Sequence, residues 1–538
     1  GGSIEVNVLQ MMGADMAGTL SSTNGGFQPD LWRGTPRQTA DRLLMVMPVH
    51  TTSPAMRSLM RRLFLTQAIP PAGNGIDGGF VARRLELLAA MGDVDAVEQL
   101  LAITPGRETN VRLIQIETDI RLLRGDFVRA CALANGPWQE SIDDFWQKLV
   151  IFCEVLKGAD AEAQLGLSLL REVGLKDEVY FLMLDAMLAA ETPVVNDLSN
   201  LSPLHVGIIR ASGARLPPDS MAALPPAILS AMAVNPDMAM RERLEAAEQA
   251  AGTGVLPIGD LRILYDGVAF DEAILEHPLS TAETLSGPEA RALLYQVVNR
   301  QTVDGARAEA ASLALETTRD ADIYATTAQV FNHVIKQVPP RTDLIWFAGH
   351  AVRALVVAGD AEAAAGWLTL LRVNASLSDE ASLTLSQLAP VVRLAGLDDA
   401  NQLVPARIDD WRNAGGDARE NRKRAVLYYS LLESLGHPVD PPVWDDLGFT
   451  EALSADDTDA VGQTPELPDP VLWHRLASAA RSGKTGETVL LALATLGSRG
   501  TAGAHPVTIS HVVQSLAMVG LDTEARALAV EAALAGGL

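Results

Sequence analysis

This chain of 538 residues has few cysteines, few aromatic residues and fewer basic than acidic residues. Its two cysteines, Cys131 and Cys153, are too few to define a disulfide framework or a metal site. Both lie within helical patterns, which favours buried free thiols, with a disulfide between the two as the alternative. Aromatic residues make up 5% of the chain, whereas apolar residues make up 48%. Alanine and leucine therefore supply most of the apolar surface, a composition that favours close-packed helices over sheets.

The deficit of basic residues gives a formal net charge of −25. Such a surface repels phosphate, so we expect neither nucleic acid nor an anionic lipid surface as a partner. Residues 1–92 are the exception, with eight arginines against six acidic residues. No uninterrupted apolar run reaches the length that a membrane span needs, and we predict no transmembrane segment. Because the chain begins with Gly1 rather than Met, it stays open whether a signal sequence preceded it.

A repeated turn signal is the most informative feature that is present. Glycines separated by 33 residues, each between two apolar helical patterns, occur at Gly92, Gly125 and Gly158. The next position at this spacing is Glu191, so we expect the period to continue there without glycine. Similar turns follow at Gly359, Gly396 and Gly520. Glycine provides the left-handed residue after one helix, and the aspartate that often follows it caps the next helix.

The stretch "GDFVRA", residues 125–130, resembles the centre of a tetratricopeptide repeat, in which Gly, an aromatic residue and Ala recur at this spacing. That family has a repeat of about 34 residues. The resemblance implies an all-α fold, a right-handed α-solenoid of stacked antiparallel helical hairpins. Two further stretches, "DLWRGTPRQTADRLL" and "TSPAMRSLMRRLFLTQAIPP", resemble uncharacterised secreted Ala/Leu/Arg-rich helical-repeat proteins of Gram-negative bacteria. This second resemblance implies a location in the cell envelope, the periplasm or outside the cell, and brings no known activity.

Composition and proline content divide the chain into seven predicted segments. They are an extended N-terminal arm (1–30), N-terminal helices and a connector (31–79), a regular tetratricopeptide-like array (80–191), irregular short-helix repeats (192–343), a second helical-repeat array (344–450), an acidic linker (451–470) and a C-terminal helical unit (471–538). Alternation typical of a strand occurs only in "IEVNV" near the start.

Two motifs suggest anion binding, and both are weak. Gly483-Lys484-Thr485 matches the end of a phosphate-binding loop, but Ser478 stands where that loop needs a glycine and a helical pattern precedes it. We predict a turn between two helices there, with Thr485 as the cap. The basic run "RENRKR", residues 419–424, is interpreted as the solvated first turn of a helix, with an anion site as the alternative. No complete catalytic or metal-binding motif occurs, so the chain is predicted to be no enzyme and to need no cofactor and no metal.

Five residues near the start are candidates for contact with a partner protein. The aromatic pair Phe27 and Trp32 either docks the arm onto the first helices or anchors another protein. Arg57, Arg61 and Arg62 lie on successive turns of one helical pattern and suit acidic partners, although a solvent-facing stripe is the alternative.

The predicted function is that of a non-enzymatic protein-binding scaffold in the bacterial envelope, with other proteins, such as an envelope assembly, as partners. One alternative is an accessory or degenerate peptidoglycan-processing protein with a helical superstructure. Another is a cytosolic tetratricopeptide-type co-chaperone. The ligand, the binding face and the oligomeric state stay open.

Overall fold

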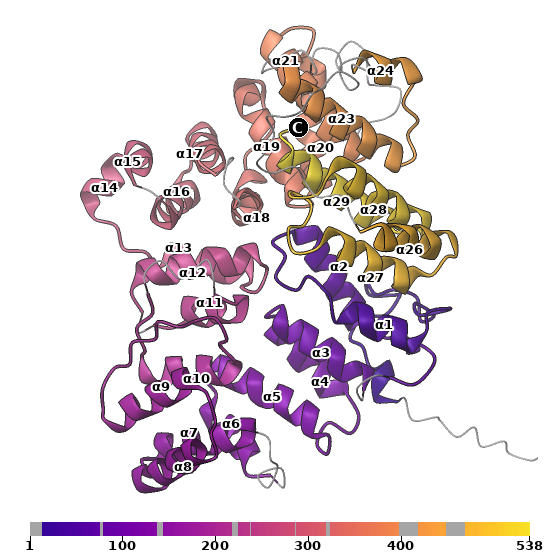
Figure 1. The fold of residues 1–538 in the computed structure, drawn as a ribbon. Coiled ribbons are helices and arrows are strands. Elements are labelled where there is room, and N and C mark those ends of the chain that lie inside the picture. Colours follow the sequence, from indigo (N-terminus) through magenta and orange to yellow (C-terminus); the bar gives the residue numbers. More distant parts are fainter. Residues whose placement is uncertain are drawn as a thin grey trace, which may run out of the picture. The chain divides into compact units, whose positions relative to one another are not determined.

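The computed structural model describes residues 13–75, 79–136, 144–217, 224–236, 238–285, 287–318, 323–397, 411, 418–447 and 469–538. These residues fall into two compact units (Figure 1). Unit 1 contains the described residues up to Val46 together with Met60–Ala231, and unit 2 contains Met47–Leu59 and the described residues from Met232 to Leu538. Two of the three boundaries between the units fall within helices, α2 (Pro54–Leu65) and α11 (Pro226–Ala233), and the third lies between Val46 and Met47.

Unit 1 is built from helices, as its alanine- and leucine-rich sequence predicts. Its elements are η1 (Ala14–Met16), α1 (Arg37–Leu44), the end of α2 (Pro54–Leu65), α3 (Phe80–Ala90), α4 (Val94–Ile103), α5 (Val111–Arg124), α6 (Phe127–Ala134), α7 (Asp144–Lys157), α8 (Asp160–Glu172), α9 (Glu178–Leu188) and α10 (Pro203–Ser212). Consecutive helices pack on each other from α3 to α8, α3 also contacts α5, and α5 packs on the much later helix α10.

Unit 2 is also helical. Its elements are the start of α2, α11 (Pro226–Ala233), α12 (Met240–Gly252), α13 (Ile258–Asp266), α14 (Glu272–Glu276), α15 (Pro278–Thr284), α16 (Pro288–Arg300), α17 (Asp304–Glu316), α18 (Tyr324–Ile335), η4 (Thr342–Leu344), α19 (Ile345–Val357), α20 (Ala361–Asn374), α21 (Asp379–Leu394), α23 (Ala418–Ser434), α24 (Pro441–Asp446), α26 (Pro470–Arg481), α27 (Thr485–Leu496), α28 (Pro506–Met518) and α29 (Asp522–Ala535). Consecutive helices pack from α16 to α21, and α28 packs on α23, α26, α27 and α29.

The expectation of an all-α protein is confirmed for the described part of the chain, which contains no strand and only three isolated β-bridges. The stretch "IEVNV" lies outside the described residues, as do residues 451–468 of the predicted acidic linker. None of the described helices combines the length and the apolar character that crossing a membrane requires.

The repeated glycines have the predicted backbone conformation. At the end of α5, Gly125 has a φ of +72° and its N–H donates to the carbonyl of Leu122, while the N–H of Asp126 donates to the carbonyl of Arg121. This pair of bonds satisfies the last carbonyls of the helix. Asp126 also accepts from the backbone N–H of Arg129, so it caps α6. The same geometry closes α3 at Gly92 and α19 at Gly359, where Asp93 and Asp360 are the caps.

The turn expected at Glu191 lies one residue earlier, at residue 190, and it forms there without a glycine. The N–H of Ala190 donates to the carbonyl of Met187, and the N–H of Glu191 donates to the carbonyl of Ala186, as in the glycine turns. Ala190 has a φ of +55° and is the only non-glycine residue with a positive φ among the described residues. An L-residue in this conformation costs about 1 kcal/mol relative to glycine, so the turn keeps its geometry and the fold is less stable by about that amount.

The turn at Gly483 also matches its prediction. Helix α26, not a strand, leads into it, and Gly483 has a φ of +66°. The predicted cap is wrong: Thr485 is the first residue of α27, and Lys484 occupies the cap position without a side-chain hydrogen bond. Only one residue, Lys484, separates the left-handed Gly483 from the first residue of α27, and that residue takes the cap position.

The core of unit 1 contains the two cysteines. Trp146 and Phe152 of α7 are fully buried in it together with Tyr180 of α9. The expectation of free thiols is wrong, since Cys131 of α6 and Cys153 of α7 form a disulfide with a Cα–Cα distance of 5.7 Å. The turn at Gly125 and the packing of α6 on α7 bring the two residues together, a contact that their sequence separation does not reveal.

Asp177 holds α7, α9 and α10 together by electrostatic contacts. It caps α9 by accepting from the N–H of Tyr180, and it accepts from Nζ of Lys148 at 2.7 Å and contacts Nε2 of His205 at 3.0 Å. Burial alone would raise the pKa of Asp177, but the hydrogen bonds from His205 and Lys148 outweigh it and hold the pKa well below its usual value.

Residues 13–30, in the segment predicted as an arm, contact the rest of unit 1 through a buried arginine. The guanidinium of Arg84 on α3 donates to the carbonyls of Phe64, Thr66 and Ala17. Burial lowers the pKa of Arg84 to about 10, while the charge of Asp15 acts in the opposite direction. A buried arginine with backbone carbonyl partners ties three separate segments to one another.

Candidate functional site

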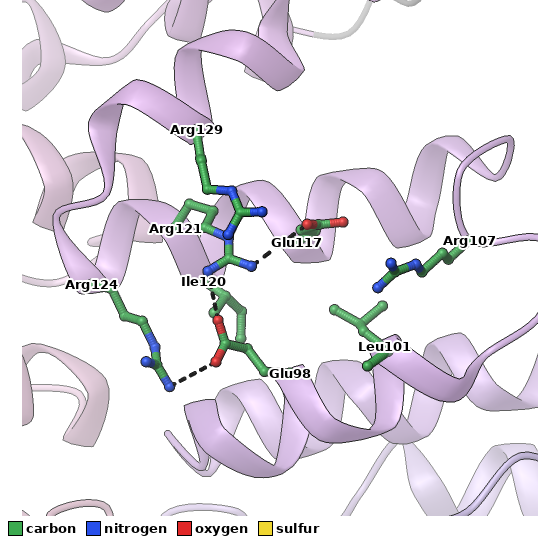
Figure 2. A pocket seen from close by; sticks show the side chains of 9 residues that line it. Glu98, Leu101, Arg107, Glu117, Ile120, Arg121, Arg124 and Arg129 are labelled. Atoms are coloured by element: carbon green, nitrogen blue, oxygen red, sulfur yellow. Dashed lines mark hydrogen bonds and ion pairs between the residues drawn. The ribbon is translucent and has the colours of Figure 1, made fainter.

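A hollow lined by arginines lies between α4, α5 and α6 in unit 1, and we call it the arginine groove. It has a volume of about 430 Å³ and is lined by Glu98, Leu101, Ala102, Arg107, Glu117, Ile120, Arg121, Arg124 and Arg129. Four cationic and two anionic side chains in one hollow contrast with a chain whose net charge is −25. Figure 2 shows these side chains converging on the space between the helices.

Two of the four arginines are engaged in ion pairs. Nη1 of Arg121 lies 2.6 Å from Oε1 of Glu98, and Nη2 lies 3.7 Å from Glu117 (Figure 2). Nη2 of Arg124 lies 3.0 Å from the other oxygen of Glu98 and also pairs with Asp95. Helical spacing places Arg121 and Arg124 on neighbouring turns of α5, so both reach the same glutamate on α4. These two arginines close one wall of the groove.

The side chains of the other two arginines, Arg107 and Arg129, have no acidic or hydrogen-bonding partner among the described residues. Arg107 extends from the loop between α4 and α5, and Arg129 extends from the first turns of α6. In Figure 2 both reach into the groove from separate elements. Each guanidinium therefore presents donors that suit a carboxylate, and the planar fork allows two parallel hydrogen bonds to one carboxylate.

The structure places the aromatic candidates Phe27 and Trp32 inside unit 1. Phe27 is 4% exposed, and the guanidinium of Arg62 lies 4.1 Å above its ring. Trp32 is 5% exposed and meets Phe80 of α3 edge-on, with the ring centres 5.3 Å apart. The interpretation in which these rings dock onto the chain's own helices agrees with this geometry. Any contact with a partner stays a prediction.

The arginine candidates on α2 also contact the chain itself. Arg57 is buried and lies against Gly254, and Arg61 forms an ion pair with Asp93 at 2.6 Å. Arg62 donates to the carbonyl of Gly26 in addition to covering Phe27. The predicted stripe is therefore not brought together with the arginine groove as one site. Its role toward a partner stays a prediction.

The sequence does not reveal the arginine groove as a unit, although it offers one signal. Arg129 lies inside "GDFVRA", one residue before the alanine near the start of the second helix of that hairpin. Arg107 lies in a connector of seven residues between α4 and α5, which carries no periodic pattern. Only the packing of α4 on α5 and of α5 on α6 unites them.

Comparisons with protein-family models, with curated proteins and with solved structures found no match to this chain.

Proposed function

We propose that this protein is a non-enzymatic scaffold, an α-solenoid of helical hairpins in the bacterial envelope, and that unit 1 binds an acidic segment of a partner protein. The observation that carries the proposal is the pair Arg107 and Arg129, two unpaired guanidinium groups that converge on one groove. A chain segment with carboxylates at suitable spacing supplies the missing acceptors. Acidic side chains or a terminal carboxylate both meet this requirement.

The solenoid architecture is supported by the order of contacts in unit 1. From α3 to α8 each helix packs on the next one in sequence, and α3 contacts α5 while α7 contacts α9. Three turns of this series have left-handed glycines at Gly92, Gly125 and Gly158. In stacked hairpins of this kind, each hairpin completes the core of its neighbour and leaves a groove lined by side chains of successive repeats.

The envelope location is supported by the Cys131–Cys153 disulfide. Disulfides persist in the bacterial periplasm and outside the cell, whereas the cytosol keeps thiols reduced. The bond therefore favours the envelope over the cytosolic co-chaperone alternative.

Binding at the groove has to overcome the net charge of the whole protein. A charge of −25 repels an acidic peptide at long range, but this repulsion is screened beyond about 10 Å at moderate ionic strength. Within the groove, the contacts to Arg107 and Arg129 are short and direct. The expected behaviour is slow, weakly steered association followed by contacts that decide the dissociation rate.

A peptide-binding measurement tests the proposal. The probe is a short fluorescein-labelled peptide of alternating Glu and Ala, and its anisotropy is followed with the full chain and with the double variant Arg107→Gln/Arg129→Gln. Loss of two charge-assisted contacts is expected to weaken binding by at least about tenfold. The matched control Arg33→Gln/Arg171→Gln removes the same charge from unit 1 outside the groove and should bind as the parent does.

Three results would speak against the groove as the binding site. The first is equal affinity of the parent and the groove variant. The second is an equal loss in the control variant, which would indicate a general effect of charge. The third is equal binding of a peptide in which Lys replaces Glu.

A further inference from the structure

Unit 2 contains a second and larger hollow, which we call the unit 2 cavity. It has a volume of about 1170 Å³ and lies among the start of α2, the helices α18, α19, α23 and α29, and the loop after α27. Its apolar wall includes Val356, Val357, Val530 and Leu534. Pockets that hold small organic ligands have volumes of about 300–1000 Å³, so this cavity has room for a whole molecule of that class.

The charged side chains of the unit 2 cavity are nearly all basic. Among the described residues that line it, four are arginines, Arg353, Arg424, Arg499 and Arg526, and one is acidic, Glu531. The protein as a whole has 67 acidic and 42 basic side chains, so this balance reverses that of the chain. The basic side chains of the wall offer counter-charges to an anion, while Arg353 and Arg499 also have partners of their own.

Glu531 does not neutralise the arginines, because its carboxylate already has partners. It accepts from the backbone N–H of Ala55 at 3.0 Å, from the hydroxyl of Thr501 and from Ser53. These groups belong to the first turn of α2 and to the loop after α27. Burial raises the pKa of Glu531, and the three hydrogen bonds oppose this rise. The carboxylate thus links α29 to the start of α2 and to the loop after α27, both of which line the cavity.

Arg424 and Trp411 meet at one wall of the cavity, and each has one buried donor without an acceptor among the described residues. The guanidinium of Arg424 lies 5.3 Å from the centre of the Trp411 ring, and its Nε is buried without a hydrogen-bond partner. Trp411 is 3% exposed, its ring meets Tyr428 edge-on at 5.5 Å, and its Nε1–H also has no acceptor. A carboxylate or sulfonate at this wall would accept charge-assisted hydrogen bonds from the guanidinium of Arg424.

The position of Arg424 corrects one interpretation of the sequence. The sequence predicts a solvated first turn of a helix for the run "RENRKR", and the exposed side chain of Lys423 agrees with that. Arg424 is the next residue on α23, and it lines the cavity instead. One helical step of about 100° separates the solvent face from the cavity face.

We infer that the unit 2 cavity binds an organic anion with an apolar body, a carboxylic or sulfonic acid of small-molecule size. The anionic group pairs with the guanidinium of Arg424 at the cavity wall, and the apolar body lies along the valine and leucine side chains of α19 and α29. Neither an uncharged apolar molecule nor a bare inorganic anion uses both features. This site is separate from the arginine groove and does not depend on it.

Two dyes of nearly the same shape test this inference with the full chain. 8-Anilinonaphthalene-1-sulfonate carries a sulfonate, and N-phenyl-1-naphthylamine has the same aromatic body without it. The expected result is saturable fluorescence enhancement with one sulfonate dye per chain, at least about tenfold tighter than for the neutral dye. Octanoate should displace the sulfonate dye, and octanol should not.

Variants locate the dye. Arg424→Gln should weaken binding of the sulfonate dye by at least about tenfold and leave the neutral dye unaffected. The matched control Arg241→Gln removes an exposed arginine of α12 in the same unit and should change neither. Ala527→Trp keeps every arginine and fills the cavity from α29, so it should abolish binding even if Arg424→Gln does not fold. The inference is overturned by equal affinity for both dyes, by unchanged affinity in Ala527→Trp, or by an equal loss in Arg241→Gln.

Discussion

Breaking the Cys131–Cys153 disulfide is the most direct perturbation of unit 1. The change is made chemically with dithiothreitol or genetically with Cys131→Ser/Cys153→Ser. Cys153 is buried in the core beside Trp146, whereas Cys131 is half-buried, so a reductant reaches the bond from the α6 side. Neither treatment removes a helix or a charge. The difference between the oxidised and reduced protein therefore reports the cross-link itself.

The size of the effect follows from the loop that the bond closes. The two cysteines are 22 residues apart in the sequence. Closing a loop of this length in the unfolded chain lowers its entropy by about 11 cal/mol/K, which corresponds to about 3 kcal/mol at 25 °C. Domains are typically stable by only about 5–15 kcal/mol. Reduction should thus remove a large share of the stability of unit 1 without unfolding it outright.

Urea unfolding combined with hydrogen exchange measures this change. For an m-value of about 2 kcal/mol/M, the midpoint of unit 1 should fall by about 1.5 M on reduction. Because a protein of two units need not unfold in one step, exchange is compared between peptides of α7 and peptides of α19. Peptides of α7 should lose protection, and those of α19 serve as the internal control. The reasoning is refuted if alkylation finds two free thiols in the untreated protein, or if the α7 peptides keep their protection after reduction.

Three further predictions concern unit 1. Ala190→Gly should raise the free energy of unfolding by about 0.5–1 kcal/mol because glycine adopts the positive φ without strain, and Gly158→Ala should lower it by a similar amount; urea midpoints of both variants check this pair. Because the pKa of Asp177 is lowered in the folded state, its ionised form stabilises the fold above about pH 4, and this contribution is lost as the pH falls through the folded-state pKa. Asp177→Asn should therefore lower the free energy of unfolding by about 2–3 kcal/mol near neutral pH and by progressively less in acid. Urea unfolding at a series of pH values checks this. Burial raises the pKa of Asp119 to about 7, so its ionisation destabilises the fold progressively as the pH rises from about 4 to about 7. Asp119→Asn should therefore stabilise the protein by at least about 1 kcal/mol more at about pH 8 than at about pH 5, as urea midpoints will show, and an equal effect at both would contradict this.

The glycine turns between helices are the part of the fold that the sequence predicts best. A left-handed glycine and a capping aspartate act through hydrogen bonds within a few residues, so Gly125 and Asp126 carry their own structural information. Insertion of one residue changes the outcome: after Gly158 the cap position falls on Ala159, and Asp160 becomes the first residue of the helix. The composition predicts the all-α class for a similar reason, because the helix propensity of alanine and leucine is a local property of each residue.

Contacts between distant segments are the part that the sequence does not reveal. The packing of α5 on α10, the disulfide, and the approach of Glu531 on α29 to Ala55 on α2 each join residues without a shared pattern. The arginine groove and the unit 2 cavity are hidden in the sequence for the same reason, because each is lined by residues from several separate elements. Nothing within "RENRKR" tells that Lys423 is exposed and that Arg424 lines the cavity, because this difference depends on the elements that pack around α23.

Acidic residues are abundant enough in this chain that a basic side chain near other elements readily finds one. The capping aspartates illustrate this: Asp93 pairs with Arg61, Asp360 pairs with Lys336, and Asp126 lies 3.9 Å from Arg121 while each also caps a helix. An arginine that lines a hollow and has no acidic partner among the described residues is therefore held away from the abundant acids by the fold itself.

Arg107 and Arg129 in unit 1 and Arg424 in unit 2 are arginines of this kind. Arg129 is exposed and has water for its donors, so an anion that binds there replaces contacts with water by charge-assisted hydrogen bonds. Arg107 and Arg424 are half-buried and lose part of that water, which an anion restores. The same physical argument therefore assigns ligand-binding roles to both hollows. Their shapes separate the ligands: a groove of about 430 Å³ between repeats suits an extended acidic chain, and a cavity of about 1170 Å³ with valine and leucine walls suits a whole organic anion.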